Sequence, residues 1–166
     1  MSSLQHMQML TRYKAWADRR VFAALAALPS DALLAPRAMV FGSVVRALNH
    51  VYCMDQVWQA HLQGVAHHFT TRNPPFTSTF SALRTAQEKI DAWYVAYAQA
   101  LQPDLADEII DFTFIGGGAG AMSRADILFH VVNHGSYHRG QVAAALYQPS
   151  APFPVTDLPV FLREEI

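Results

Sequence analysis

Four of the eight histidines stand at positions that could bind a metal ion. Three of them, His130, His134 and His138, follow one another at four-residue steps in the segment HVVNHGSYHRGQV. Residues four apart in a helix share one face at about 6 Å, so neighbouring pairs could chelate one ion. His130 and His138 would lie about 12 Å apart along the axis, which is too far for one ion. The chelating pair is therefore His130 with His134, or His134 with His138.

The apolar positions of the same segment favour the second pair. They form a stripe that a helix would turn toward a protein interior: Ile127, Val131, Val142 and Ala145. His134 and His138 fall close to the centre of this stripe, whereas His130 lies toward one edge, because each four-residue step rotates the side chain by about 40°. We therefore expect His134 and His138 to point into the interior.

A third ligand should come from another helix that faces the same interior. His50, in LNHVYCMDQVW, lies beside Ala47 and Met54 on a second apolar stripe. Three neutral imidazoles that converge in a helix bundle leave an open coordination position, which is typical of catalytic metal sites. The alternative is that each is a hydrogen-bonded core histidine, the usual role of a lone histidine on an apolar face. The HxxxH pattern lacks the glutamate of the HExxH protease motif, so it does not decide between a metal site and hydrogen-bonded core histidines.

Proline and glycine separate the elements that would position these histidines. None of the nine prolines falls inside four long segments with helical periodicity, which run from about 4–28, 43–63, 79–101 and 123–147. Pro29 ends the first, Ser43 and Gly64 are an N-cap and a C-terminal stop for the second, and Ser123 with Asp126 forms a capping-box variant in the fourth.

The remaining segments predict smaller elements. Residues 109–115 are β-branched and aromatic and precede a glycine run, which indicates a short β-hairpin or loop before the last long helix. The proline-rich tail has room for one short helix from about Asp157. The sequence thus predicts an all-α four-helix bundle that forms one domain over 1–166.

Composition excludes several classes of protein. Of 166 residues, 52% are hydrophobic and 15% are charged, against about 25% charged in ordinary soluble domains, which argues against disorder and favours a partner subunit. The net charge is −1 and no basic run occurs, so no nucleic-acid partner is expected. No signal sequence and no stretch of about 20 apolar residues is present, so we expect a cytoplasmic protein without a membrane partner. The single cysteine, Cys53, excludes an internal disulfide.

The sequence resembles the DinB/YfiT-like family. The resemblance rests on NHxxxHRGQ within residues 130–142 and on LNHVYCMDQVW at 48–58. TRYKAWADRR at 11–20 and DLPVFLRE at 157–164 support it. The resemblance implies a four-helix bundle, usually a homodimer, with a divalent metal held by one histidine of the second helix and two of the last. His50, His134 and His138 are the ligands by that correspondence.

Histidine ligands favour zinc or nickel, with iron or copper as alternatives, over magnesium or calcium. Relatives that use low-molecular-weight thiols imply a metal-dependent enzyme, with thiol S-transfer ahead of hydrolysis of a small-molecule substrate. The alternative is a non-catalytic metal-binding or stress-response bundle that acts as a dimer. No general base is apparent, so no catalytic acid or base is assigned.

Several other residues carry weaker expectations. Arg139 either pairs with a substrate carboxylate or, as we favour, braces a neighbouring helix. Asn133 and Asp55 either orient an imidazole through its second N–H or lie in solvent. Cys53 is expected to be a small buried hydrophobe.

The glycines and the other histidines of the sequence are expected to be structural. Gly135 and Gly140 would each allow close helix packing. No ligand spacing links the remaining histidines to the three candidate ligands, so surface positions are expected for His6, His61, His67 and His68.

Overall fold

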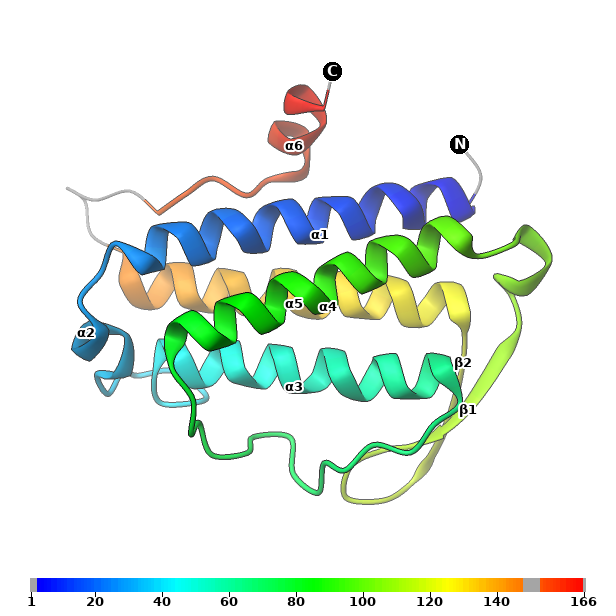
Figure 1. Cartoon of the computed structure of the whole chain (residues 1–166), viewed down its shortest axis with the longest axis horizontal. Coiled ribbons are helices and arrows are strands. Elements are labelled where there is room, and N and C mark those ends of the chain that lie inside the picture. Colours follow the sequence, from blue (N-terminus) through cyan, green and yellow to red (C-terminus); the bar gives the residue numbers. More distant parts are fainter. Residues whose placement is uncertain (1–2, 148–152, 166) are drawn as a thin grey trace.

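Four long helices lie side by side and a small hairpin covers one end of them (Figure 1). The computed structural model describes residues 3–147 and 153–165. Its helices are α1 (Ser3–Ala26), α2 (Ser30–Leu34), α3 (Val44–Gln63), α4 (Phe80–Ala100), α5 (Arg124–Leu146) and α6 (Leu158–Glu164), with a 3₁₀ turn at Pro103–Leu105. In the bundle, α1 and α3 each contact both α4 and α5. The predicted four-helix architecture is confirmed.

The first helix is shorter than expected. It ends at Ala26 and not near Leu28, because the residue before a proline is disfavoured in helical conformation and Pro29 follows. The short helix α2 was not predicted, since five residues are too few for a periodic pattern. Its Leu33 is buried in the core.

The predicted helix ends are confirmed by their capping contacts. The Ser43 hydroxyl accepts a hydrogen bond from the Arg46 backbone N–H, and the Ser123 hydroxyl accepts one from Asp126. Gly64 ends α3 in the left-handed conformation with φ 67°, which a glycine adopts without steric cost. These contacts fix where α3 and α5 begin, and therefore where their histidines lie.

The hairpin consists of the antiparallel strands β1 (Ile109–Thr113) and β2 (Ala119–Ser123). Its register pairs Phe112 with Gly120, and a Cβ on Gly120 would lie 2.5 Å from the Phe112 ring. The glycine therefore leaves the space in which this ring lies over the sheet. Phe112 is buried and packs edge-on against Trp58 of α3, with ring centroids 4.9 Å apart. This contact attaches the hairpin to the bundle.

The core consists of two main apolar clusters separated by polar residues. One cluster includes Trp58, Tyr94 and Val131, and the other includes Val21, Leu48 and Val142. Along each long helix, buried polar side chains lie between the stretches that contribute to these two clusters. In the described ranges, no helix is long and apolar enough to span a membrane.

Candidate metal centre

The three predicted ligands converge between α3 and α5. The Nε2 atom of His134 lies 3.1 Å from the Nε2 atoms of both His50 and His138. One ring nitrogen of each histidine lies within 4.8 Å of the others, so this histidine cluster could hold a metal ion. His50 and His138 are buried, and His134 is half-buried. Spacing along α5 and the stripe on α3 were therefore sufficient to predict which histidines meet.

Hydrogen bonds on the far side of two rings decide which nitrogen faces the cluster. The Nδ1 atom of His50 contacts the backbone carbonyl of Arg72, and Nδ1 of His138 lies 2.9 Å from Oε1 of Gln141. Both oxygens can only accept, so each Nδ1 carries the proton and donates it. In a neutral imidazole this leaves the lone pair on Nε2, where it points at the cluster.

The Nε2 atom of His134 faces the Nε2 lone pairs of both His50 and His138 and cannot donate a hydrogen bond to each of them. If the Nε2 atom of His134 carries a proton, it has one N–H for two acceptors at equal distance. If it does not, three lone pairs face one another. The Nδ1 atom of His134 is buried with no hydrogen-bond partner in the described protein. A cation bound by the three Nε2 atoms would remove this conflict, so the donor set fits a metal ion.

Burial keeps the three imidazoles of the cluster in the neutral form that binds a metal ion. It lowers the pKa of His134 to about 3, with further lowering from His138 and His50. Burial also lowers the pKa of His138 to about 4 and lowers the pKa of His50. All three imidazoles are neutral at pH 7, as metal ligation requires. Three nitrogen donors suit zinc, nickel, copper or iron(II) better than magnesium or calcium.

A cavity of about 570 Å³ reaches the histidine cluster from the hairpin side. Its lining includes His50 and His134 of the cluster, Trp58 of α3, and Phe112 and Phe114 of the hairpin. The size is that of small-molecule sites, which range over about 300–1,000 Å³. The cavity gives a ligand access to the two imidazoles, and we refer to it as the histidine cavity.

His130 also lines the histidine cavity but does not join the cluster. Its ring stacks on His134 at 5.6 Å and packs edge-on against Trp58 at 4.8 Å. The expectation of surface positions is met by His6 and His68, which are exposed, but is wrong for His61 and His67.

His61 in particular is half-buried and lines the histidine cavity. Its ring contacts those of Trp58 and Phe112 at 5.5 and 5.3 Å. His61 lies one turn after Trp58 on α3, where the hairpin packs over it. Residue spacing on α3 alone does not reveal that cover.

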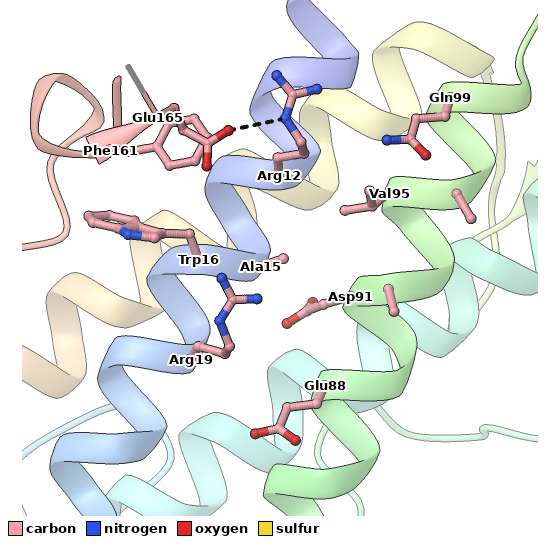
Figure 2. Close-up of a pocket in the computed structure, with 12 residues that line it drawn as sticks. Arg12, Ala15, Trp16, Arg19, Glu88, Asp91, Val95, Gln99, Phe161 and Glu165 are labelled. Atoms are coloured by element: carbon pink, nitrogen blue, oxygen red, sulfur yellow. Dashed lines mark ion pairs between the residues drawn. The ribbon is translucent and has the colours of Figure 1, made fainter. Parts of the chain in front are cut away.

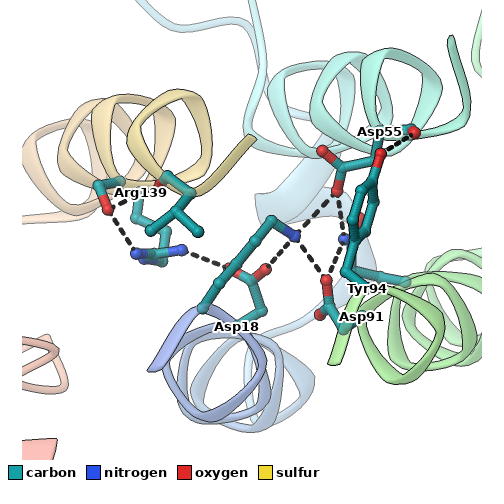
Figure 3. A network of polar contacts seen from close by, with 9 residues as sticks. Asp18, Asp55, Asp91, Tyr94 and Arg139 are labelled. Atoms are coloured by element: carbon teal, nitrogen blue, oxygen red, sulfur yellow. Dashed lines mark hydrogen bonds and ion pairs between the residues drawn. The ribbon is translucent and has the colours of Figure 1, made fainter. Parts of the chain in front are cut away.

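Behind the histidine cluster lies a polar layer made of Lys14, Asp18, Asp55, Gln87, Asp91 and Arg139 (Figure 3). The Lys14 ammonium donates to Asp18 at 3.0 Å, to Asp55 at 2.9 Å and to Asp91. Gln87 donates to Asp55 at 2.8 Å and to Asp91 at 3.0 Å. One lysine of α1 thus connects carboxylates of α1, α3 and α4.

Arg139 extends the polar layer to α5. Its guanidinium donates to Asp18 at 2.8 Å and to the Ser136 hydroxyl at 2.8 Å. The favoured interpretation, that Arg139 braces a neighbouring helix, agrees with these contacts. Neither expectation for Asp55 was right, because it is fully buried on Lys14 and touches no imidazole. The sequence did not predict this layer, whose local signals are the four-residue spacings of Lys14 with Asp18 and of Gln87 with Asp91.

Opposing effects set the protonation of the polar layer. Burial would lower the pKa of Lys14, but three carboxylates outweigh it and raise that pKa well above its ordinary value. Burial would raise the pKa of Asp18, but Lys14 and Arg139 together lower it. Burial prevails at Asp91 and raises its pKa to about 7. The lysine is therefore charged. Burial also raises the pKa of Asp55, and the pKa of Asp91 lies near neutrality.

The groups that orient the imidazoles differ from the two that were expected. Asn133 is exposed on α5, whereas Gln141 and the Arg72 carbonyl contact His138 and His50. Gln141 lies one turn after His138, a local signal that could have identified it. Arg72 belongs to the loop between α3 and α4, 22 residues from His50, and no sequence spacing indicates it.

Two small residues near the site behave differently from each other. A Cβ on Gly135 would lie 3.2 Å from Nη1 of Arg139 and 3.3 Å from Cε of Lys14, so this glycine allows close packing as expected. No atom lies within 4 Å of such a Cβ at Gly140, so the same expectation is wrong there.

Cys53 is buried as predicted, and burial raises the pKa of its thiol to about 11.

A second cavity, of about 600 Å³, lies between α1 and α4 near α6 (Figure 2). Its lining includes Arg12, Arg19 and Glu88 at the rim and Asp91 of the polar layer, but no histidine. Arg12 pairs with Glu165 at 3.7 Å across the rim. This cavity does not include the histidine cluster, and the buried Asp91 lies in its wall.

Known proteins are similar to this chain in fold and in sequence. A DinB-like protein from Bacillus cereus ATCC 10987 has the same fold, with a TM-score of 0.63 and 19% identity over 84% of this chain and 90% of that one. Protein DinB of Bacillus subtilis (strain 168) is 26% identical over 159 residues, which are 92% of this chain and 91% of the relative. The model of the DinB family matches residues 1–165. The chain therefore belongs to the DinB family.

Proposed function

We propose that this protein is a metal-dependent enzyme whose ion is held by His50, His134 and His138, and that it catalyses thiol S-transfer in preference to hydrolysis. The observation that carries the proposal is the convergence of three neutral imidazole nitrogens beside a cavity of small-molecule size. Zinc or nickel is expected ahead of iron or copper. A bound ion would act as a Lewis acid that lowers the pKa of a thiol or water in its open position.

The lining of the histidine cavity supports thiol chemistry over hydrolysis. Metal-dependent hydrolysis commonly uses a carboxylate as general base beside the attacking water, as in HExxH enzymes. Among the described residues, no aspartate or glutamate lines this cavity. A thiol has an ordinary pKa of about 8.5, so it needs far less help than water to lose its proton. A low-molecular-weight thiol is therefore the expected nucleophile.

The residues of the chain would have distinct roles in this reaction. The Arg72 carbonyl and Gln141 hold the rings of His50 and His138 with Nε2 toward the ion. The aromatic walls of the cavity would exclude water from the reacting groups. Cys53 would take no part, since its buried thiol has a raised pKa and remains protonated at pH 7.

The second candidate is a non-catalytic metal-binding or stress-response protein that acts as a homodimer. It is favoured by the low charged fraction of 15% and by large apolar side chains exposed on α5, where Phe129 and Tyr137 are 53% and 61% exposed. Such side chains commonly mark contact surfaces. Sedimentation analysis of the intact protein would give the mass of two chains if the dimer forms, and of one chain if it does not.

Thiol-dependent consumption of an electrophile tests the enzymatic proposal. We expect zinc- or nickel-loaded protein to accelerate the reaction of a small thiol with monochlorobimane. Cys53→Ser should retain this activity and His134→Ala should lose it. If the protein hydrolyses an activated ester but does not consume thiol, hydrolysis and not S-transfer is its activity. Tight metal binding with neither activity would favour the non-catalytic protein.

A further inference from the structure

Three aromatic side chains, Trp58, Phe112 and Phe114, form one wall of the histidine cavity. Trp58 and Phe112 meet edge-on at 4.9 Å and 78°, and Phe112 meets Phe114 at 5.0 Å and 86°. Phe114 lies in the cavity lining yet is 51% exposed. Successive perpendicular rings present both faces and edges, so a flat aromatic ligand could contact either.

The charges around this wall favour an anion. Arg72 is the one residue with a permanently charged side chain among the described residues of the lining, which includes no carboxylate. The backbone carbonyl of Arg72 accepts a hydrogen bond from His50, so the loop holds this arginine beside the histidine cluster. A guanidinium binds a carboxylate through two parallel hydrogen bonds.

We infer that the histidine cavity binds a small planar aromatic carboxylate, with its ring against Trp58, Phe112 and Phe114 and its carboxylate at Arg72. The inference rests on the proposed function, because it takes this cavity as the substrate site of the metal-dependent enzyme. The aromatic wall selects the flat ring, and Arg72 selects the negative charge. The ligand would enter past Phe114, the exposed member of the wall.

Calorimetric titration with 1-naphthoate tests both parts of the inference. The comparison ligands are decahydronaphthalene-1-carboxylate, which keeps the charge without the aromatic faces, and 1-naphthalenemethanol, which keeps the rings without the charge. We expect 1-naphthoate to bind about tenfold more tightly than either, the usual worth of one aromatic contact or one charged hydrogen bond. Equal affinity for the saturated acid would overturn the aromatic part, and equal affinity for the alcohol would overturn the anionic part.

Two pairs of variants locate the binding. Phe114→Ala should weaken naphthoate binding about fivefold, whereas Phe129→Ala, equally exposed at 53% but outside the cavity lining, should leave it unchanged. Arg72→Gln should weaken it about tenfold, whereas Arg163→Gln on α6 should not. All four side chains are exposed, so loss of folding is not expected to obscure the result. Equal affinities within either pair would place the ligand elsewhere and overturn the inference.

The titration is repeated with metal-free and zinc-loaded protein, which separates this inference from the proposed function. Naphthoate selectivity in a protein that binds neither zinc nor nickel would count against the metal-dependent enzyme and support the ligand class. Zinc binding that depends on His50, without selectivity for naphthoate, would refute the ligand class alone.

Discussion

The amide oxygen of Gln141 lies 2.9 Å from Nδ1 of His138, one helical turn away on α5. This contact makes Nδ1 the protonated nitrogen of His138 and leaves the Nε2 lone pair pointing at His134 and His50. A single turn of helix therefore carries both a candidate metal ligand and the group that orients it. Of the HRGQ segment, His138, Arg139 and Gln141 therefore each have a structural role, Arg139 through its place in the polar layer.

Loss of the orienting amide should weaken metal binding. Gln141→Leu leaves the ligands in place but removes the acceptor for His138, and such changes typically reduce metal affinity about 10–100-fold. Asn133→Leu, on the exposed side of the same helix, should leave the affinity unchanged. Competition with a chromophoric zinc chelator measures both. Equal affinities for the two variants would show that Gln141 does not orient the ligand.

Removing the central ammonium of the polar layer should destabilise the fold. Lys14→Met leaves three buried carboxylates without their shared cation, and breaking a buried ion pair in this way costs about 3–5 kcal/mol. Lys89→Met, at an exposed position of α4, should change the free energy of unfolding by less than about 0.5 kcal/mol. Urea denaturation compares them. A similar small effect at both sites would contradict the role assigned to Lys14.

The raised pKa of Asp91 should make stability depend on pH. Burial raises this pKa from 3.8 to about 7, so between those values the folded protein keeps a proton that the unfolded chain releases. The free energy of unfolding therefore loses up to about 1.4 kcal/mol per pH unit as pH rises through this window, and levels off above it. Lys14 and Asp18 of α1 and Asp55 of α3 surround Asp91. The pKa of Lys14 lies above this window and that of Asp18 below it, whereas the pKa of Asp55 is raised.

Asp91→Asn should remove this contribution, because the amide cannot lose a proton in that range. Urea denaturation from about pH 4.5 to about pH 8, with chelator present, should show the variant gaining stability relative to the wild type as pH rises. The histidines are common to both proteins, so their contributions cancel in the difference, whereas the contribution of Asp55 changes with that of Asp91 because the two carboxyl groups interact. Parallel curves would mean that Asp91 is already ionised at the lower end of the range.

The two glycines of α5 should respond oppositely to alanine. Gly140→Ala introduces a Cβ with no atom within 4 Å and should stabilise the helix by about 0.5–1 kcal/mol. Gly135→Ala must displace the side chains of Lys14 and Arg139, so a net loss of stability is expected. Thermal unfolding of both variants checks the signs. A gain at Gly135 equal to that at Gly140 would show that the polar layer relaxes freely.

Local patterns were sufficient to predict much of this protein. The caps at Ser43 and Ser123 and the stop at Gly64 were visible in the sequence because each acts within four residues. Helical periodicity predicted that His134 and His138 point into the bundle interior, and the apolar stripe on α3 predicted the same for His50. Information that is local in sequence was therefore enough for the bundle and for the histidine cluster.

Contacts between distant segments were not predictable in this way. The spacing of Lys14 and Asp18 does not reveal the other partners of the lysine, because Asp55 and Asp91 lie 41 and 77 residues away along the chain. The role of Gly120 depends on the cross-strand register that places it opposite Phe112, which no local pattern shows. Such roles arise only once the chain has folded.

Elemental analysis of protein purified without a metal-affinity tag tests the metal centre most directly. We expect about one transition-metal ion per chain in the wild type and in His130→Ala, and its loss from His50→Ala and His134→Ala. His130→Ala is the matched control, since His130 stacks on His134 but lies outside the cluster. A wild-type protein that binds no metal, with thermal stability unchanged in all three variants, would contradict the metal centre and the enzyme built on it.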